Sequence, residues 1–369
     1  MNALVEDLRT SPAHGGAIPR PVAQARLALL GTGTVGSAVL ARLAAWQDSG
    51  FAPGLQLAHV ANSRRAVDGE AGLAPGLARA RLDGSDQASR LDDVPAALRG
   101  AGKSIVVDAT ASAEVAARHA AWLEQGIHVV TACKLARGTS LAGWQAVEVA
   151  KSRGGSQYGD AATVGAGLPL LRSIRDLRAG GDRIHAVAGV LSGSLAWLFN
   201  HYDGLRPFSG FVRNARDAGY TEPDPREDLS GEDVRRKLLI LARAAGVALE
   251  QEAVEVTSLV PPDMAALGRG EVDAALPRLD PLLRQRYAQA YKNGEVLRFV
   301  ARLEQGRARV GLESLPADHA LAGGAGTDNR VAIWSDRYRD QPLVIQGPGA
   351  GAEVTAAGLL DDVLRIAAS

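Results

Sequence analysis

Two oppositely charged residues, Asp233 and Lys237, stand four positions apart in a stretch whose apolar residues recur at helical spacing. Residues four apart share one face of a helix, so the carboxylate and the ammonium group should project side by side. An ammonium group beside a reacting carbonyl can stabilise the charge that develops on its oxygen and can donate a proton to it. The spacing therefore permits acid catalysis, although on its own it favours an ordinary helix ion pair.

The loop before this helix, residues 219–229, is polar, contains prolines and adds two acids, Glu222 and Asp228. We expect the helix to run from Ser230 to Ala245 with Ser230 as its N-cap. A capping box formed by Ser230 and Asp233 would give Asp233 a purely structural role. The apolar stripe that this helix buries lies about 100° around the axis from the charged pair, and it consists of Val234, Leu238 and Leu241.

A glycine turn near the start of the chain is the second feature with chemical meaning. A short apolar run, residues 27–30, precedes it, and apolar residues at helical spacing follow it. In this context Gly31 permits a tight turn, Gly33 lets the backbone approach a pyrophosphate, and Gly36 allows close packing. The alternative, a structural turn without a ligand, is disfavoured by the strand–turn–helix order. The residues predicted to bind a dinucleotide, with amides of the helix N-terminus included, are Gly31, Gly33, Thr34, Val35 and Gly36.

The end of the next expected strand, residues 55–61, bears on which dinucleotide is bound. Sites for NAD usually place an acid there, and this acid holds the ribose hydroxyls. This chain instead continues with Asn62-Ser63-Arg64-Arg65. Arg64 is therefore a candidate for binding the 2′-phosphate, and NADP is favoured over NAD. The alternative is that both arginines are solvated and contact no cofactor.

The elements that must position these residues alternate between strand and helix. Apolar strands are expected at residues 55–61, 105–110 and 127–131, and an alanine-rich helix with Ser112 as N-cap precedes the last of them. This order is typical of a Rossmann-type doubly wound parallel sheet in an α/β protein. A Ser/Gly stretch near residues 151–156 interrupts it. We therefore assign residues 25–153 to a dinucleotide-binding domain and residues 1–24 to a loose tail.

The rest of the chain mixes its elements differently. Helices are expected at residues 168–177 and 195–201, and strands at residues 184–191, 296–303 and 308–312. Strands and helices that do not alternate regularly are typical of an α+β arrangement. We therefore expect a second domain of this type at residues 154–345.

The bulk composition excludes several classes of protein. A chain of 369 residues is too long for one ordinary core, so two packed regions are expected. Positive and negative side chains number 41 each, which favours neither nucleic acid nor an anionic membrane as a partner. Apolar stretches are broken well before the roughly 20 residues that a bilayer span needs. The single cysteine, Cys133, forms no intrachain disulfide, which indicates the reducing cytoplasm.

The stretch from Gly219 to Lys237 resembles the signature of the homoserine dehydrogenase family. It reads Gly-Tyr-Thr-Glu-Pro-Asp-Pro-Arg, then Asp-Leu-Ser-Gly, and ends in Asp-Val-x-Arg-Lys. Further segments match the family in the same order, and they are residues 31–36, 130–134, 164–169, 189–194 and 347–358. A collinear set of matches that spans nearly everything from Arg26 to Ala367 is specific.

The resemblance implies an activity and the roles of several residues. The reaction would be the NAD(P)-dependent interconversion of L-aspartate 4-semialdehyde and L-homoserine, in threonine, methionine and isoleucine biosynthesis. Lys237 matches the family's proton donor, and Lys134 matches a lysine beside the nicotinamide and the substrate. Glu222 and Asp233 match substrate-binding acids, to which we add Asp228, and Asp233 can also hold Lys237. For Lys134 the alternative is an ordinary lysine at a strand end.

The resemblance also implies how the chain is organised. Thr110 and Gly351 match further cofactor contacts, so residues 346–369 should return to the nucleotide domain. The second domain, residues 154–345, should bind substrate and form a homodimer through its sheet, and pairing of dimers into a tetramer stays open. We expect neither the threonine-sensing regulatory domain nor the fused aspartokinase of other members, because few residues follow Gly358 or precede Arg26.

Two positions depart from the family's pattern. Asparagine is usual where this chain has Cys133, for which we expect a small buried residue without chemistry rather than a redox-sensitive thiol. Many relatives have a glutamate that helps to bind a monovalent cation where this chain has Ala161, and Asp160 could replace it. The sequence leaves metal binding open. The backbone carbonyl groups that could still bind Na+ belong to Val164, Ala166 and Leu168.

Other functions compete with this interpretation. A nucleotide-bound regulator without turnover would keep the fold, but such a sensor has no use for a proton donor such as Lys237. A dehydrogenase for another amino acid or semialdehyde remains a second enzyme hypothesis. An acylating aldehyde dehydrogenase is disfavoured, because Cys133 lies at a strand end where the family has asparagine.

Overall fold

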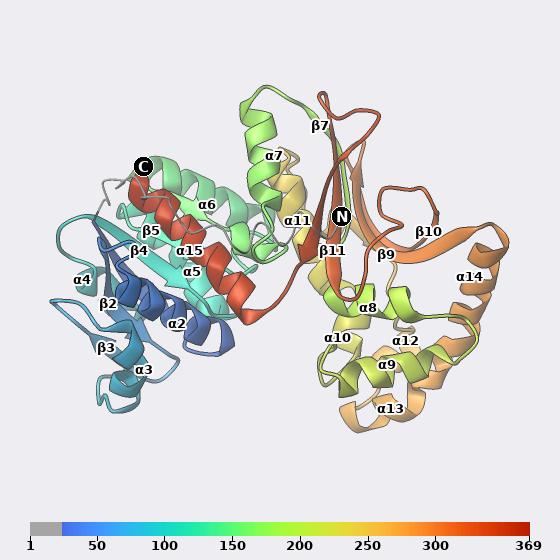
Figure 1. Cartoon of the computed structure of the whole chain (residues 1–369), viewed down its shortest axis with the longest axis horizontal. Helices are drawn as coiled ribbons and strands as arrows, with labels where there is room; N and C mark the ends of the chain where they lie inside the picture. Colours follow the sequence, from blue (N-terminus) through green and yellow to red (C-terminus); the bar gives the residue numbers. More distant parts are fainter. Residues whose placement is uncertain (1–23) are drawn as a thin grey trace, which may run out of the picture.

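Two six-stranded sheets organise the chain in the computed structural model, which describes residues 24–369. The predicted N-terminal tail lies outside these residues, apart from Gln24. Figure 1 shows the two sheets in separate halves of the molecule, with the C-terminal helix returning to the half that contains the N-terminal strands. The prediction of an α/β protein with a Rossmann-type sheet and an α+β second domain is confirmed.

The first sheet has the order β3-β2-β1-β4-β5-β6. All neighbouring pairs are parallel except β2 and β3, because β3 returns through a tight hairpin. Its strands are β1 (Ala25–Leu30), β2 (Leu55–Ala61), β3 (Ala66–Asp68), β4 (Lys103–Asp108), β5 (His128–Thr131) and β6 (Tyr158–Gly159). The sheet therefore extends beyond the expected boundary at residue 153. The Ser/Gly stretch that suggested this boundary is the end of a helix, where Gly155 takes a left-handed conformation with φ 60°.

Helices cover the first sheet, and the last helix of the chain is one of them. They are α2 (Thr34–Ser49), α3 (Pro75–Asp83), α4 (Val94–Ala97), α5 (Ala113–Glu124), α6 (Leu141–Gly154) and α15 (Ala352–Ala368). The hydroxyl group of Ser112 accepts a hydrogen bond from the amide of Val115, as expected for the N-cap of α5. Leu359 and Val363 of α15 belong to the same core cluster as Leu27 and Val39, so α15 is packed into the first domain (Figure 1).

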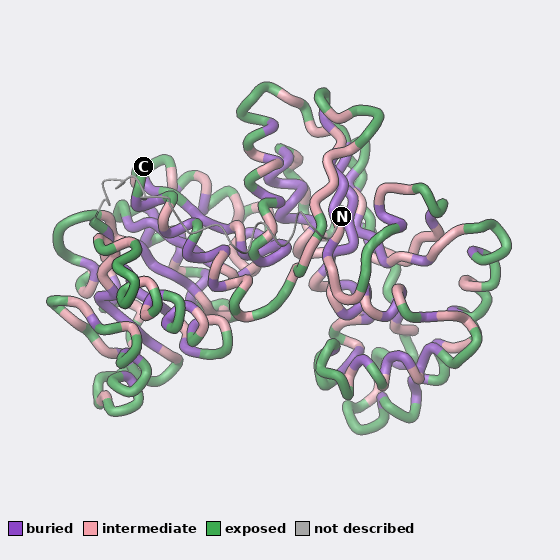
Figure 2. The backbone as a smooth tube through the Cα atoms, viewed as in Figure 1, coloured by how far each residue is buried: buried purple, intermediate pink, exposed green. Residues whose placement is uncertain are grey.

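The second sheet has the order β12-β11-β7-β9-β10-β8, and every pair is antiparallel except β8 and β10. Its strands are β7 (Ile184–Val190), β8 (Val254–Val256), β9 (Glu295–Glu304), β10 (Arg307–Pro316), β11 (Asp328–Ser335) and β12 (Leu343–Pro348). Its helices are α7 (Leu170–Ala179), α8 (Gly193–His201), α9 (Phe208–Asp217), α10 (Arg226–Leu229), α11 (Glu232–Ala244), α12 (Pro262–Ala265), α13 (Val272–Ala275) and α14 (Asp280–Lys292). In Figure 2 the buried residues follow the strands and the inner faces of the helices in both halves.

The start of α11 differs from the expectation. Ser230 follows the short helix α10, and its hydroxyl donates to the carbonyl of Glu227 instead of forming a capping box with Asp233. Gly231, with φ 79°, separates the two helices, because a left-handed conformation ends α10 and favours glycine. The expected stripe is confirmed, since Val234, Leu238 and Leu241 are at most 2% exposed.

None of the helices between residues 24 and 369 combines the length and the apolar character required to cross a membrane.

Candidate active site

The first turns of α11 bring three charged side chains together. Lys237 Nζ lies 2.8 Å from Asp233 Oδ2, as helical spacing predicts. Lys134 Nζ, from the other domain, lies 3.4 Å from Asp233 Oδ1. Lys237 also donates a hydrogen bond of 2.8 Å to the carbonyl of Leu191, which follows β7. One carboxylate therefore holds two ammonium groups that are about a hundred residues apart in the sequence.

The charge on this carboxylate is stable over a wide pH range. Burial alone would raise the pKa of Asp233, but the ammonium groups of Lys237 and Lys134 lower this pKa to about 2. Lys237 is the more enclosed of the two lysines, with a side chain that is 12% exposed, against 30% for Lys134. An ammonium group has three protons, and Asp233 and Leu191 accept two of those on Lys237. The third proton is available to a further acceptor.

The strand-end segment that carries Lys134 is ordered by buried hydrogen bonds. Asp108, at the end of β4, accepts hydrogen bonds from the hydroxyl groups of Thr110 (2.6 Å) and Thr131 (2.9 Å). The hydroxyl oxygen of Thr131 in turn accepts from the amide of Cys133 at 2.8 Å. The carboxyl ends of β4 and β5 are thus tied together, and Lys134 follows directly.

The acids of the preceding loop have different environments. Asp228 accepts hydrogen bonds from the Ser194 hydroxyl (2.7 Å) and from the backbone amide of Glu222 (2.8 Å). Burial raises the pKa of Asp228. Both of its oxygens hold the local structure, whereas the Glu222 side chain is exposed and makes no hydrogen bond or ion pair to the described part of the chain. Glu222 is thus the acid that is free to meet a ligand.

The glycine turn has the geometry of a dinucleotide cradle. Gly31 has φ 93°, and a Cβ atom there would lie 2.9 Å from the carbonyl oxygen of Ala109. A Cβ atom at Gly36 would lie 1.9 Å from the carbonyl oxygen of Gly31, so only glycine fits there. Gly33 faces open space, and the exposed Thr34 and half-buried Val35 begin α2 with amides that the helix does not use. These features fit a pyrophosphate at the helix N-terminus.

Two further predicted cofactor contacts lie on separate elements. The side chain of Thr110 lies directly against Gly31, because a Cβ atom on Gly31 would come within 2.8 Å of its methyl group. Gly351 precedes α15 and has φ 124°, a conformation that favours glycine. Contacts therefore connect Gly31 through Thr110 and Asp108 to the Lys134 segment. Within residues 24–369, neither Gly351 nor Arg64 has a hydrogen bond or ion pair to that chain of residues.

Arg64 and Arg65 occupy the hairpin between β2 and β3 and differ in their contacts. The side chain of Asn62 accepts hydrogen bonds from the amides of both arginines, each at 2.8 Å. The guanidinium group of Arg65 donates to the carbonyl of Asp83. The Arg64 side chain is exposed and has no ion pair or hydrogen bond within residues 24–369. Arg64 is thus the arginine that is available to a phosphate.

The acid suggested for the predicted cation site, Asp160, is already paired within the described residues. Both oxygens of Asp160 bind arginine, at 2.6 and 2.8 Å from Arg175 and at 2.9 Å from Arg137. The replacement of the missing glutamate by Asp160 stays a prediction. The amide of Ala161 instead donates to Asp362 of α15 at 2.9 Å. The described residues contain no cluster of three or more His, Cys, Asp or Glu that could hold a metal. Of the three predicted carbonyl groups (Val164, Ala166 and Leu168), that of Leu168 already accepts the amide of Leu170 at 2.8 Å.

Sequence reasoning missed several residues that shape the site. Ser194 was part of a matched segment, but no role was assigned to it. The ring centroids of Trp197 and Tyr220 lie 5.4 Å apart beside the loop that carries Glu222. Tyr220 lies within the family signature, which was the available signal for it. Cys133 is 4% exposed, and burial raises the pKa of its thiol, which supports the expectation of an unreactive packing residue.

A Rossmann-type sheet with a glycine cradle, together with a half-buried lysine held by a carboxylate, defines the class of nicotinamide-dependent oxidoreductases. Two family models match the chain. The model described as homoserine dehydrogenase, NAD binding domain, matches residues 31–158, and the model described as homoserine dehydrogenase matches residues 169–364. The chain belongs to the homoserine dehydrogenase family.

Two relatives that are named as homoserine dehydrogenases agree with this assignment, and one solved structure shares the fold. The chain is 42% identical over 266 residues to a chloroplastic bifunctional aspartokinase/homoserine dehydrogenase of Zea mays. The aligned residues cover 71% of this chain but only 29% of that protein's length. It is 37% identical over 278 residues to a homoserine dehydrogenase of Emericella nidulans, covering 72% of this chain and 76% of that one. A crystal structure of a Candida auris protein of unknown function has a TM-score of 0.87, with 35% identity over 94% of this chain and 98% of the other.

Proposed function

We propose that this protein is an NADP-dependent homoserine dehydrogenase that interconverts L-aspartate 4-semialdehyde and L-homoserine (EC 1.1.1.3). The observation that carries the proposal is the meeting of Lys134, Asp233 and Lys237 from two domains, with separations of 2.8 and 3.4 Å. Family membership supports the reaction type and a nicotinamide cofactor.

In the proposed mechanism, a bound nicotinamide supplies or accepts the hydride. Lys237 directs its remaining proton to the substrate oxygen, stabilises the charge that develops there and donates the proton. Asp233 orients Lys237 through the ion pair at 2.8 Å. Glu222, which is exposed and unpaired among the described residues, is suited to bind the α-ammonium group of the substrate, and Lys134 adds positive charge beside the reacting carbon.

Turnover measurements test this function. The purified protein should oxidise NADPH with aspartate semialdehyde, and Lys237→Ala should lower kcat at least about a hundredfold, because a positioned proton donor contributes roughly 10² to 10⁴ in rate. NADPH binding, followed by cofactor fluorescence, should change little. Lys292→Ala, which removes an exposed lysine from α14, is the matched control. Unchanged turnover in Lys237→Ala would refute the assigned proton donor.

Further parts of the proposal need separate tests. A homodimer through the second sheet is expected from the resemblance to the family, and light scattering measures the mass in solution. Sodium binding by the Val164, Ala166 and Leu168 carbonyls stays a prediction, which activity in sodium against tetramethylammonium salts would test. The single cysteine is consistent with the proposed location in the reducing cytoplasm. The proposed pathway is the biosynthesis of threonine, methionine and isoleucine.

A further inference from the structure

The segment that carries Lys134, residues 132–140, connects β5 to α6 and lies along α11. Gly138 lies close to α11, because a Cβ atom there would lie 3.1 Å from the carbonyl oxygen of Arg236 on α11 and 2.7 Å from that of Lys134. Just after the segment, the amide of Leu141 donates to the carboxylate of Glu250 at 2.9 Å. The strand-end segment of the first domain is thus docked on one helix of the second.

Arg243, near the end of α11, makes several hydrogen bonds in this docking. Its guanidinium group donates to the carbonyls of Arg137 (2.5 Å) and Thr139 (2.7 Å) within the segment, and to that of Leu249 (2.9 Å). The residue is only 2% exposed and has no carboxylate partner in the described part of the chain. Burying an unpaired cation is costly, so these three carbonyls must be held in place to satisfy it. Burial lowers the pKa of Arg243 to about 10, so it remains charged near neutral pH.

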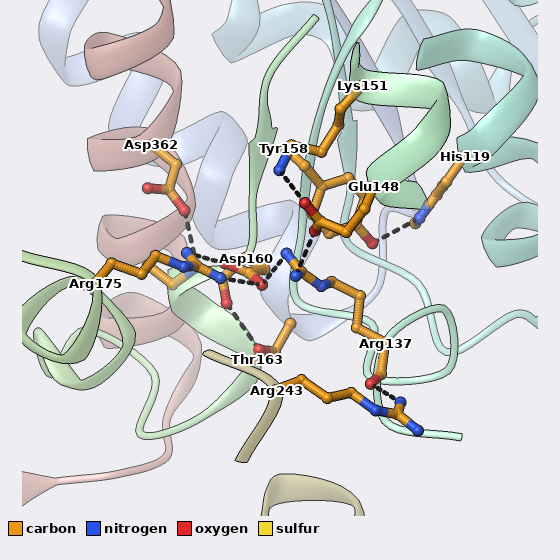
Figure 3. Close-up of polar contacts among 11 residues, drawn as sticks. His119, Arg137, Glu148, Lys151, Tyr158, Asp160, Thr163, Arg175, Arg243 and Asp362 are labelled. Atoms are coloured by element: carbon orange, nitrogen blue, oxygen red, sulfur yellow. Dashed lines mark hydrogen bonds and ion pairs between the residues drawn. The ribbon is translucent and has the colours of Figure 1, made fainter. Parts of the chain in front are cut away.

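The same segment is fixed to the first domain through the side chain of Arg137. This side chain donates to Asp160 at 2.9 Å and to Glu148 at 2.6 Å, while the carbonyl of the same residue accepts from Arg243 (Figure 3). Arg137 therefore joins the two domains three residues after Lys134. At the opposite end of α11, Asp233 binds the Lys134 ammonium group.

We propose that Arg243 is a positioning residue for the reaction: by holding the carbonyls of Arg137 and Thr139, it fixes the segment on α11 so that Lys134 faces Asp233 and Lys237. The inference rests on the proposed function, in which Lys134 acts at the site. Arg243 touches neither Lys134 nor Lys237 itself. It acts through the backbone of the segment, from the helix that also carries Asp233 and Lys237.

A double-mutant cycle separates positioning from general support of the fold. Arg243→Gln should lower kcat/KM with aspartate semialdehyde roughly ten- to a hundredfold, as expected when a catalytic group is displaced by about 1 Å. In a Lys134→Ala background the same substitution should lower it by less than about threefold, because the group that it positions is already absent. If the two effects multiply fully, Arg243 does not act through Lys134 and the proposal is overturned.

A second measurement does not depend on turnover. The chain has five lysines, namely Lys103, Lys134, Lys151, Lys237 and Lys292. With ¹³Cε-labelled lysine, the Lys134 signal is identified by its loss in Lys134→Ala. Arg243→Gln should shift this signal while those of Lys103 and Lys292 stay in place. An unmoved Lys134 signal in Arg243→Gln would overturn the proposal even if activity falls.

Arg298 provides the matched control. It is half-buried and, like Arg243, donates to three carbonyls, those of Phe199, Leu297 and Ala322, but it lies on β9 away from the segment. Arg298→Gln should lower thermal stability while leaving both the Lys134 signal and kcat/KM near the parent values. If the parent protein itself shows no turnover, the proposed function fails, while the shift of the Lys134 signal still decides whether Arg243 positions that residue.

Discussion

At the residue scale, Arg64 and Arg65 are neighbours of the same charge that should differ in their effect on cofactor choice. Arg65 is engaged with the carbonyl of Asp83, whereas Arg64 extends from the hairpin without a partner among residues 24–369. Arg64→Ala should raise the KM for NADPH about tenfold to a hundredfold, since a hydrogen bond to a charged group contributes roughly 1.5–3 kcal/mol. The KM for NADH should stay within about twofold.

Arg65→Ala serves as the control, and steady-state kinetics with both cofactors is the measurement. This variant should leave the ratio of the two KM values nearly unchanged, because its guanidinium group supports the hairpin rather than the ligand. Equal losses with NADPH and NADH in Arg64→Ala would contradict the proposed preference for NADP.

The same scale shows where sequence reasoning succeeds. The pairing of Asp233 with Lys237 follows from helical spacing alone. The contact of Lys134 with Asp233 does not follow from spacing, because it depends on how two domains dock. The family resemblance indicated only that both residues lie at the substrate. Arg243 and Ser194 were missed for a related reason: their partners, a set of carbonyls and Asp228, come together only in the folded chain.

At the element scale, the sequence predicted those helices and strands that have strong local signals and missed those that have weak ones. Strand β2 and the cap of α5 match the expectation, because an apolar run and a Ser N-cap are local features. The two-residue strand β6 was missed, since so short a strand is defined only by its pairing with β5. The start of α11 was misplaced because Ser230 resembles a cap, while the left-handed Gly231 actually separates the helices.

The docking of α15 leads to a prediction on pH. Burial raises the pKa of Asp362 to about 6, even though the amide of Ala161 and Arg365 favour its charged form. Because the pKa is raised, ionisation of Asp362 destabilises the folded chain relative to the unfolded one. This destabilisation is absent below pH 4, where the carboxyl group is protonated in both states. It grows between pH 4 and 6 and is complete above pH 6, where it reaches at most about 3 kcal/mol. Asp362→Asn should therefore stabilise the protein above pH 6.

Denaturant unfolding of the parent and of Asp362→Asn between pH 4 and 8 measures this effect. The difference in unfolding free energy should vanish near pH 4 and level off above pH 6. Asp361→Asn, at the exposed neighbouring position on α15, should show no such dependence. A variant that is less stable than the parent at pH 7 would mean that the ionised carboxylate is a net stabilising partner of Ala161.

At the scale of the whole molecule, one buried carboxylate joins the two domains. Asp160 is fully buried after β6 and binds Arg137 of the first domain and Arg175 of α7 (Figure 3). Burial alone would raise the pKa of Asp160, but the two guanidinium groups lower it to about 2. Its contribution to stability is thus present above pH 4 and is lost as the pH falls towards 2. Removing this charge leaves Arg137, which is 8% exposed, with Glu148 as its remaining counter-ion.

Asp160→Asn keeps the shape of the side chain and removes only the charge. We expect it to lower the unfolding free energy by about 3–5 kcal/mol, as is usual when one partner of a buried ion pair is lost. Because the pair connects the domains, calorimetry should also resolve two unfolding transitions where the parent shows one. Asp176→Asn is the control, because Asp176 pairs with Arg172 on the exposed side of α7 at 3.5 Å and should contribute at most about 0.5 kcal/mol. If Asp160→Asn proves as mild as this control, the domains are held together by apolar packing, and the buried charges are not what couples them.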